Sequence, residues 1–249
     1  MKRILIILFA ISFLLPTANG QLWKTRRWET SIGAGPTLFF GDIGGFSLDE
    51  NVLGLKDISF QQTRYNFDFN IKYRIVNNFN VRASLDFGAL HASDKRGSNE
   101  TRGYIATNYY VEPMALGEFY FIKNKVENSF LFLRNRDNFV RNIIRSFDFY
   151  VFSGIGAHFY NIKGNETFIT NGIKKDKGTT VVLPLGFGTN YFISPSLNIG
   201  AEVCGRYAFS DYLDGYTSQY SKRNDVYYTL NFTVTYKFTT NSRGGISFR

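Results

Sequence analysis

The chain has 249 residues, of which 44% are hydrophobic and 18% aromatic, and its formal net charge is +9 at pH 7. Twenty-six Phe and 16 Tyr are far more aromatic surface than a disordered, solvated chain carries. One cysteine excludes an internal disulfide framework, and one Cys with two His cannot fill a four-coordinate Cys/His zinc site. Abundant aromatic residues and few prolines favour β-strands.

The first twenty residues are predicted to be a secretory signal peptide. Lys2 and Arg3 supply a positive start, residues 4–15 form an apolar run, and small residues follow at 18–20. Twelve helical residues span about 18 Å, short of the ~30 Å hydrocarbon core, so a membrane anchor is disfavoured. We therefore expect a signal peptide (1–20), a folded domain (21–238) and a C-terminal tail (239–249) in a protein exported to a bacterial envelope.

Eight segments after the signal peptide alternate apolar and polar residues, which is the period of a β-strand. In the second of them, Tyr65, Phe67 and Phe69 face one way, whereas Asp68 and Lys72 face the other. The apolar face of the eight segments contains no Asp, Glu, Lys or Arg. The predicted strands are 30–40, 65–74, 79–89, 111–121, 147–159, 181–191, 197–209 and 226–238.

The opposite face carries ions of both signs together with many glycines. A transmembrane barrel turns its apolar face to lipid, where a Lys or Arg at mid-depth costs about 2–4 kcal/mol, and keeps its charges in the lumen. A β-sandwich and a lipocalin-like barrel, with apolar residues inward, are the soluble alternatives. We predict an all-β, eight-stranded, antiparallel up-and-down transmembrane barrel. Its expected lumen charge network is Asp68, Lys72, Arg82, Asp86, Glu112, Glu118, Asp148, Glu202, Arg206 and Lys237.

Connection lengths predict the orientation, because outer-membrane barrels have short periplasmic turns and long outer loops. The connections 75–78 and 192–196 are short, whereas 41–62, 90–110, 160–180 and 210–224 are long, which places both termini in the periplasm.

One expected periplasmic connection, 122–146, departs from this rule because it is 25 residues long and basic. Its arginines and lysines could contact lipid phosphates or form a docking element for a periplasmic partner. The residues concerned are Lys123, Lys125, Arg134, Arg136, Arg141 and Arg145.

Residue types that could support catalysis are few. His91 lies near Ser93 and Asp94, and His158 is predicted to point inward, so an outer-leaflet lipid-modifying enzyme is conceivable. Glu112 and Glu118 lie about 20 Å apart along one strand, too far for an acid/base couple. They are better interpreted as partners of lumen cations, and we expect no catalytic residue.

Other possible sites are equally weak. Asp211 and Asp214 offer too few oxygens for a calcium site, and Cys204 is expected to be an inert inward side chain. Paired glycines at 33/35, 154/156 and 186/188 are expected to make room inside a narrow barrel. With eight strands the lumen is only wide enough for side chains, which disfavours a porin. We expect no cofactor, metal, small-molecule substrate or nucleic acid, and interpret the basic charge as contact with anionic lipid.

Several segments resemble a family of small Bacteroidetes outer-membrane barrels that includes PorG, a component of the type IX secretion system. They agree in order and spacing across 28–238, although the tail beyond Phe238 departs from the family pattern. The segments are Gly33-Ala34-Gly35, Phe40-Gly41-Asp42-Ile43-Gly44, Phe152 to Tyr160, Leu185-Gly186-Phe187-Gly188, Asn198 to Glu202, Ser210 to Gly215 and Tyr236-Lys237-Phe238.

The resemblance implies a non-enzymatic barrel in the bacterial outer membrane that anchors periplasmic ring proteins of that secretion machine. The basic connection 122–146 is where the contact would lie, although no family motif fixes individual residues there. The alternatives are a structural or surface-binding barrel whose outer loops contact a ligand, and the lipid-modifying enzyme.

Overall fold

A computed structural model describes residues 25–44, 60–95, 100–123, 147–217, 224–241 and 244–247. The predicted signal peptide and most of the basic connection, including Lys125, Arg134, Arg136, Arg141 and Arg145, lie outside these ranges.

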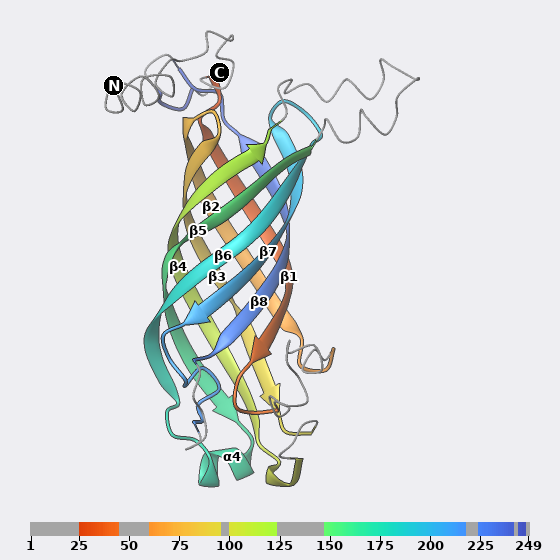
Figure 1. Ribbon diagram of the computed structural model, residues 1–249, viewed down its shortest axis with the longest axis vertical. Helices are drawn as coiled ribbons and strands as arrows, with labels where there is room; N and C mark the ends of the chain where they lie inside the picture. The colour runs from red at the N-terminus through yellow and green to blue at the C-terminus, as the bar shows by residue number, and fades with distance from the viewer. Residues whose placement is uncertain are drawn as a thin grey trace, which may run out of the picture.

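The described residues form a closed barrel in which each strand is antiparallel to its neighbours in the sequence, and β1 pairs with β8 (Figure 1). This confirms the predicted up-and-down topology. The strands are β1 (Trp28–Phe40), β2 (Arg64–Val76), β3 (Phe79–Ser93), β4 (Ile105–Ile122), β5 (Phe147–Gly164), β6 (Lys177–Phe192), β7 (Leu197–Ala208) and β8 (Val226–Lys237).

Alternation along each strand separates the two faces of the barrel as predicted. In β2 and β8 almost every second side chain is exposed and the one between is buried. Large apolar side chains form the outer surface; Leu185 is 68% exposed and Phe232 is 62% exposed. The charged side chains of the strands lie inside, except for Arg64, Lys163 and Lys177 at strand ends. The chain is therefore a transmembrane β-barrel, because such a surface requires hydrocarbon around it and every strand has a hydrogen-bonded neighbour on both sides.

Several strands are longer than the alternation predicted. β3 continues to Ser93, β4 begins at Ile105 and β5 continues to Gly164. The predicted long connections 90–110 and 160–180 were therefore too long, and His91 lies in a strand and not in a loop. The prediction failed because inward positions near these ends are apolar, as at Leu90, Tyr110 and Ile162, so the polar half of the pattern disappears.

The two ends of the barrel differ. At one end lie the turns after β2 and β6, the beginning of β1 and the end of β8 (Figure 1). At the other end lie the short helix α4 (Glu166–Asn171) and the 3-10 turn η3 (Glu100–Arg102). The side chain of Asn165 caps α4 by accepting a hydrogen bond from the amide of Phe168.

Part of the C-terminal tail folds back on the beginning of β1. Thr240 forms a bridge with Ile246, and its hydroxyl accepts a hydrogen bond of 2.8 Å from the amide of Arg27. The indole of Trp28 donates to the carbonyl of Gly244 at 3.0 Å. The described part of the tail is thus attached to the end of the barrel where β1 begins, which we call the tail end.

Glycines make room inside the narrow barrel, as predicted. A Cβ added at Gly186 would lie 2.2 Å from the ring of Phe152, and one at Gly188 would lie 2.3 Å from the ring of Tyr150. Since both rings are buried, they cannot move into solvent to accept a larger residue.

None of the helices among the described residues is long and apolar enough to cross a bilayer.

We expect Leu85→Arg to lower the free energy of unfolding by about 2–4 kcal/mol, because Leu85 faces lipid near the middle of β3. The matched control is Ile75→Arg at the end of β2, for which the expected cost is about 0–1 kcal/mol. Urea unfolding in lipid vesicles measures both; equal costs at the two positions would contradict the assignment of the lipid-facing side.

Candidate functional site

Four ions from β2, β3, β4 and β7 meet inside the lumen. The ammonium of Lys72 lies 2.8 Å from Glu118 Oε1 and 3.5 Å from Glu202 Oε1. Arg82 Nη1 lies 3.0 Å from Glu118 Oε1 and 2.8 Å from Glu202 Oε1. The hydroxyl of Tyr150 donates to Glu202 Oε1 at 2.6 Å. We call these four ions the central cluster; with two cations and two anions it is neutral, as a buried charge network must nearly be.

A second group of ions lies further toward α4. Arg206 Nε is 2.8 Å from Glu112 Oε1, and Arg206 Nη2 also contacts Asp86 Oδ2. His158 Nδ1 lies 2.6 Å from Glu112 Oε2, to which the hydroxyl of Tyr227 also donates. The ring of Tyr110 stacks on His158 with centroids 4.8 Å apart. His158 points inward as predicted, but it is fully buried, so a lipid substrate cannot reach it.

All ten residues predicted for the lumen charge network are buried, with exposed fractions of 5% or less. The structure separates Glu118 from Glu112 and gives each an arginine partner, Arg82 and Arg206, as expected from their spacing. It also adds an ion pair that the prediction omitted, Glu29 with Arg74 at 2.6 Å near the tail end of the barrel. Glu29 has the inward parity of β1, so extending the alternation one residue before 30–40 would have identified it.

Bulky side chains, including those of the ions themselves, fill the lumen. Among the largest fully buried side chains are those of Lys72, Arg74, Tyr150, Phe192 and Tyr227, which come from the four strands β2, β5, β6 and β8. Lys237 Nζ lies 4.3 Å from the centroid of the Phe192 ring. Eight strands enclose an interior just wide enough for side chains, and these buried side chains occupy it.

An apolar cluster, which we call the cap, closes the α4 end of the barrel. Phe168 of α4 is fully buried there, against residues of the strands and connections at this end. The sequence analysis did not identify the cap; the available signal was the loss of polar residues at inward positions of β3, β4 and β5. Its members include Phe39, Ile43, Leu90, Tyr104, Tyr110, Tyr160, Ile162, Phe168, Val182, Leu213 and Tyr227.

Buried carboxylates connect the segments of the cap. Asp94 accepts hydrogen bonds from the amides of Gly44 at 2.9 Å and Tyr104 at 3.1 Å, and pairs with Arg102 at 2.7 Å. Asp214 accepts from the amide of Ile43 at 3.0 Å.

The two aspartates considered for calcium binding, Asp211 and Asp214, accept hydrogen bonds from the protein itself. Asp214 also accepts from the amide of Tyr216 at 2.9 Å, and Asp211 accepts from the hydroxyl of Thr217 at 2.5 Å. Within the described ranges, no three His, Cys, Asp or Glu side chains are grouped as a metal site would require.

The catalytic candidates around His91 have separate partners. His91 Nδ1 lies 2.8 Å from the hydroxyl of Thr107. The carboxylate of Asp94 instead accepts a hydrogen bond from the amide of Tyr104 in the cap. The backbone carbonyl of Ser93 accepts from Gln62 at 3.0 Å, and its hydroxyl accepts from the amide of Lys95. In the described part of the chain these three residues do not form the hydrogen-bonded series that activates a serine. Cys204 is buried in the lumen, as predicted.

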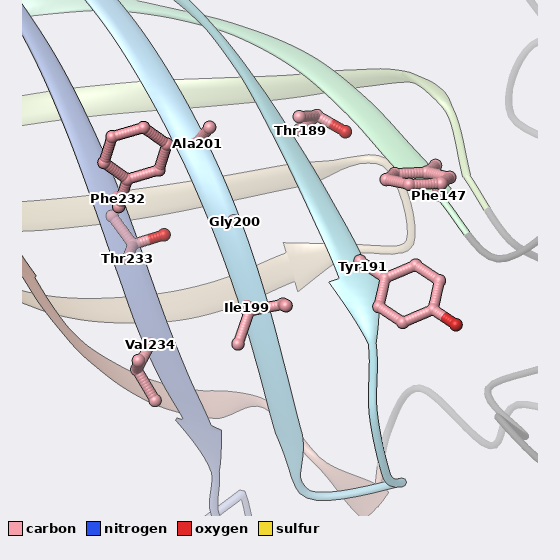
Figure 2. Close-up of a pocket in the computed structure, with 9 residues that line it drawn as sticks. All are labelled: Phe147, Thr189, Tyr191, Ile199, Gly200, Ala201, Phe232, Thr233 and Val234. Carbon is pink, nitrogen blue, oxygen red and sulfur yellow. The ribbon is translucent and has the colours of Figure 1, made fainter.

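The membrane-facing wall contains a groove of about 540 Å³ near the tail end of the barrel (Figure 2). Its lining includes the large side chains of Phe147, Tyr191, Ile199, Phe232 and Val234. The small residues Thr189, Gly200 and Ala201 also line it. Polar groups do not converge on this groove, so its chemistry is that of a surface for hydrocarbon chains and not of an active site.

Of the predicted partner-binding residues, the structure describes Lys123. Its ammonium contacts the carbonyl of Asn77 in the turn after β2 and lies 4.7 Å from the centroid of the Tyr120 ring. The other five lie outside the described ranges.

No protein-family model and no curated protein matches the chain. Three solved structures similar in fold are Neisserial surface protein A, the N-terminal β-barrel domain of OprF from Pseudomonas aeruginosa, and Ail, the attachment invasion locus protein of Yersinia pestis. Their identities are 9%, 10% and 13%, and their TM-scores are 0.44, 0.44 and 0.41. The alignments cover 85%, 84% and 85% of this chain and 96%, 97% and 97% of theirs. The likeness concerns the fold alone.

Arg82→Met is expected to lower the free energy of unfolding by about 3–5 kcal/mol, because it leaves Glu118 and Glu202 with one cation between them. Adding Glu202→Gln should restore part of the loss by rebalancing the central cluster. Urea unfolding of the single and double variants in vesicles tests this; a double variant less stable than Arg82→Met would contradict it.

The cap should loosen as pH rises. Burial, with the nearby charge of Asp42, raises the pKa of Asp214 from 3.8 to about 7, so the folded cap favours the protonated acid. Between pH 4 and pH 7 an unfolded cap releases this proton and the folded one retains it; stability therefore falls across that window. Amide protection of Ile43 and Tyr216, measured by hydrogen exchange and corrected for intrinsic rates, should be lower at pH 8 than at pH 5. Asp214→Asn should reduce this difference; an unchanged difference would contradict the assignment.

Proposed function

We propose that the chain is a non-conducting, non-enzymatic outer-membrane anchor, and most specifically an assembly component of a type IX secretion system. The observation that supports an anchor best is the packed lumen, where the neutral central cluster and the cap occupy the space that a pore would need. A barrel whose lumen is filled by side chains offers no passage along its axis, so we expect it to act at its ends or its outer wall.

The tail end supports the periplasmic assignment in this proposal. The two short turns lie there, and the segment that leads into β1 meets the described part of the tail there through the contacts of Arg27 and Trp28. The basic connection begins at the same end, with Lys123 against Asn77. A membrane-embedded wall with a basic element at its periplasmic end suits attachment of an acidic protein surface.

The enzymatic alternative has less support. The His158–Glu112 pair is sealed in the lumen, and His91, Ser93 and Asp94 each have other partners. A lipid substrate would need a nucleophile and a base exposed together at the membrane surface, with a hydrogen bond between them.

We predict that neutralising the basic connection abolishes co-purification of periplasmic ring proteins from outer-membrane extract. The variant replaces Lys123, Lys125, Arg134, Arg136, Arg141 and Arg145 by Gln. The physical reason is that these six positive charges supply the attraction to an acidic partner surface.

The matched control removes six charges at the opposite end, by Gln substitution of Arg64, Lys95, Lys163, Lys174, Lys175 and Lys177. It should retain the ring proteins. Heat-dependent gel migration verifies that both variants fold. If the first variant retains both ring proteins and secretion, the anchoring role is wrong.

A further inference from the structure

A second groove lies on the membrane-facing wall at the cap end, across β4, β5 and β6. Its volume is about 510 Å³. Strand pairing arranges its outward side chains in two rows. Tyr109, Asn161 and Lys177 form the row nearer the cap, and Val111, Phe159 and Thr179 form the next row toward the middle of the barrel.

The two rows are adjacent along the strands but differ in polarity. Residues two apart on a strand are about 7 Å apart, so the groove changes from polar to apolar within that distance. The row nearer the cap carries an ammonium, an amide and a phenol, whereas the inner row offers two apolar side chains and a threonine. Such a boundary is expected where the hydrocarbon region ends and the headgroups begin.

Lysines gather beside the polar row. Lys163 lies two residues beyond Asn161 on the same face of β5, with its ammonium 5.7 Å from the centroid of the Tyr109 ring. Lys175, just before β6, approaches the cap instead, with its ammonium 6.0 Å from the ring of the cap residue Tyr160 and 5.8 Å from the Tyr212 ring. Lys163, Lys174, Lys175 and Lys177 are all exposed, and the neighbouring exposed acids are Glu166 and Asp176, so the surface has a net positive charge.

The other lipid-facing groove provides a contrast. The groove near the tail end is lined by aromatic, aliphatic, Thr and Gly residues and has no charged residue in its lining (Figure 2). It suits hydrocarbon along its whole length. The groove at the cap end combines an apolar floor with positive charge at one end, which is the complement of a lipid with an anionic headgroup.

We propose that the groove across β4, β5 and β6 binds a phosphate-bearing lipid of the outer leaflet. An acyl chain lies against Val111, Phe159 and Thr179, and the phosphate lies between Lys163 and Lys177. Assigning the lipid to the outer leaflet rests on the orientation in the proposed function, in which the cap end faces outward. The binding chemistry itself depends only on the groove and its lysines.

The test measures binding of lipid A to the full-length protein in phosphatidylcholine nanodiscs. Lys163→Gln with Lys177→Gln should weaken binding roughly thirtyfold, because each lysine at an anionic lipid surface contributes a factor of about five. The matched control, Arg64→Gln with Lys95→Gln, removes the same charge from the β2–β3 side of the cap end and should leave binding unchanged. Thr179→Trp keeps the charge and fills the apolar row, so it should also weaken binding.

Gel migration verifies folding of each variant. Equal weakening by both double variants would show attraction to general surface charge and overturn the proposal. Undiminished binding of dephosphorylated lipid A would overturn it as well, since the phosphate would then contribute nothing.

The leaflet is tested separately from the affinity. Nanodiscs offer lipid A on both faces, so the binding result does not depend on orientation. Thr170→Cys places a thiol on exposed α4, and a membrane-impermeant maleimide should label it on intact cells, whereas the buried Cys204 should stay unlabelled. Absence of labelling, with labelling after lysis, would reject the outer leaflet and the proposed orientation together and leave the groove's affinity intact.

Discussion

Hydrocarbon around the barrel cannot solvate an ion or a backbone amide, and the rest of the structure follows from that. Each strand therefore has a hydrogen-bonded neighbour on both sides, which a sheet achieves only by closing on itself. For the same reason, the ions along the middle of the strands turn inward. Inside a narrow barrel these ions have little water, so they have to solvate one another.

The interior meets this demand by pairing charges across strands that are far apart in the sequence. Arg82 of β3 reaches Glu202 of β7, and Arg206 of β7 reaches Glu112 of β4. Such pairs cross the lumen and connect opposite walls. These ion pairs do not by themselves make the barrel more stable than apolar side chains of similar volume would. A substitution that removes one ion of a pair, however, leaves the other charge buried and unpaired. Large rings such as Tyr150 and Phe152 fill the remaining space opposite glycines of β6.

The two ends of the barrel are closed by different kinds of contact. Toward the cap, the inward residues are apolar instead of ionic. Buried carboxylates such as Asp94 hold the connecting segments there by accepting hydrogen bonds from their backbone amides. Toward the tail, Glu29 and Arg74 pair, and the chain after β8 folds back onto Arg27 and Trp28. Since the axis is filled between them, contacts with other molecules are left to the ends and to the two grooves on the outer wall.

Strand number, sidedness and the ten lumen ions could be predicted from the sequence because alternation is local and a membrane penalises every exception to it. Partner choice could not: Glu112 and Glu118 have the same parity on the same strand, and only the closed sheet assigns one to Arg206 and the other to Arg82. The alternation does not predict the ends of β3, β4 and β5, because Leu90, Tyr110 and Ile162 are apolar and face inward. For the same reason it predicts a loop at His91, which lies in β3.

The most direct test of this account is which side of a strand contacts lipid. Spin labels at Leu85 and Phe232, and at Ser84 and Thr233, can be introduced in a Cys204→Ala background in vesicles. The account predicts that labels at the first two positions collide with oxygen dissolved in the bilayer and that labels at the second two are shielded in the lumen. Labels at Ser84 and Thr233 that meet lipid, with those at Leu85 and Phe232 enclosed, would contradict it.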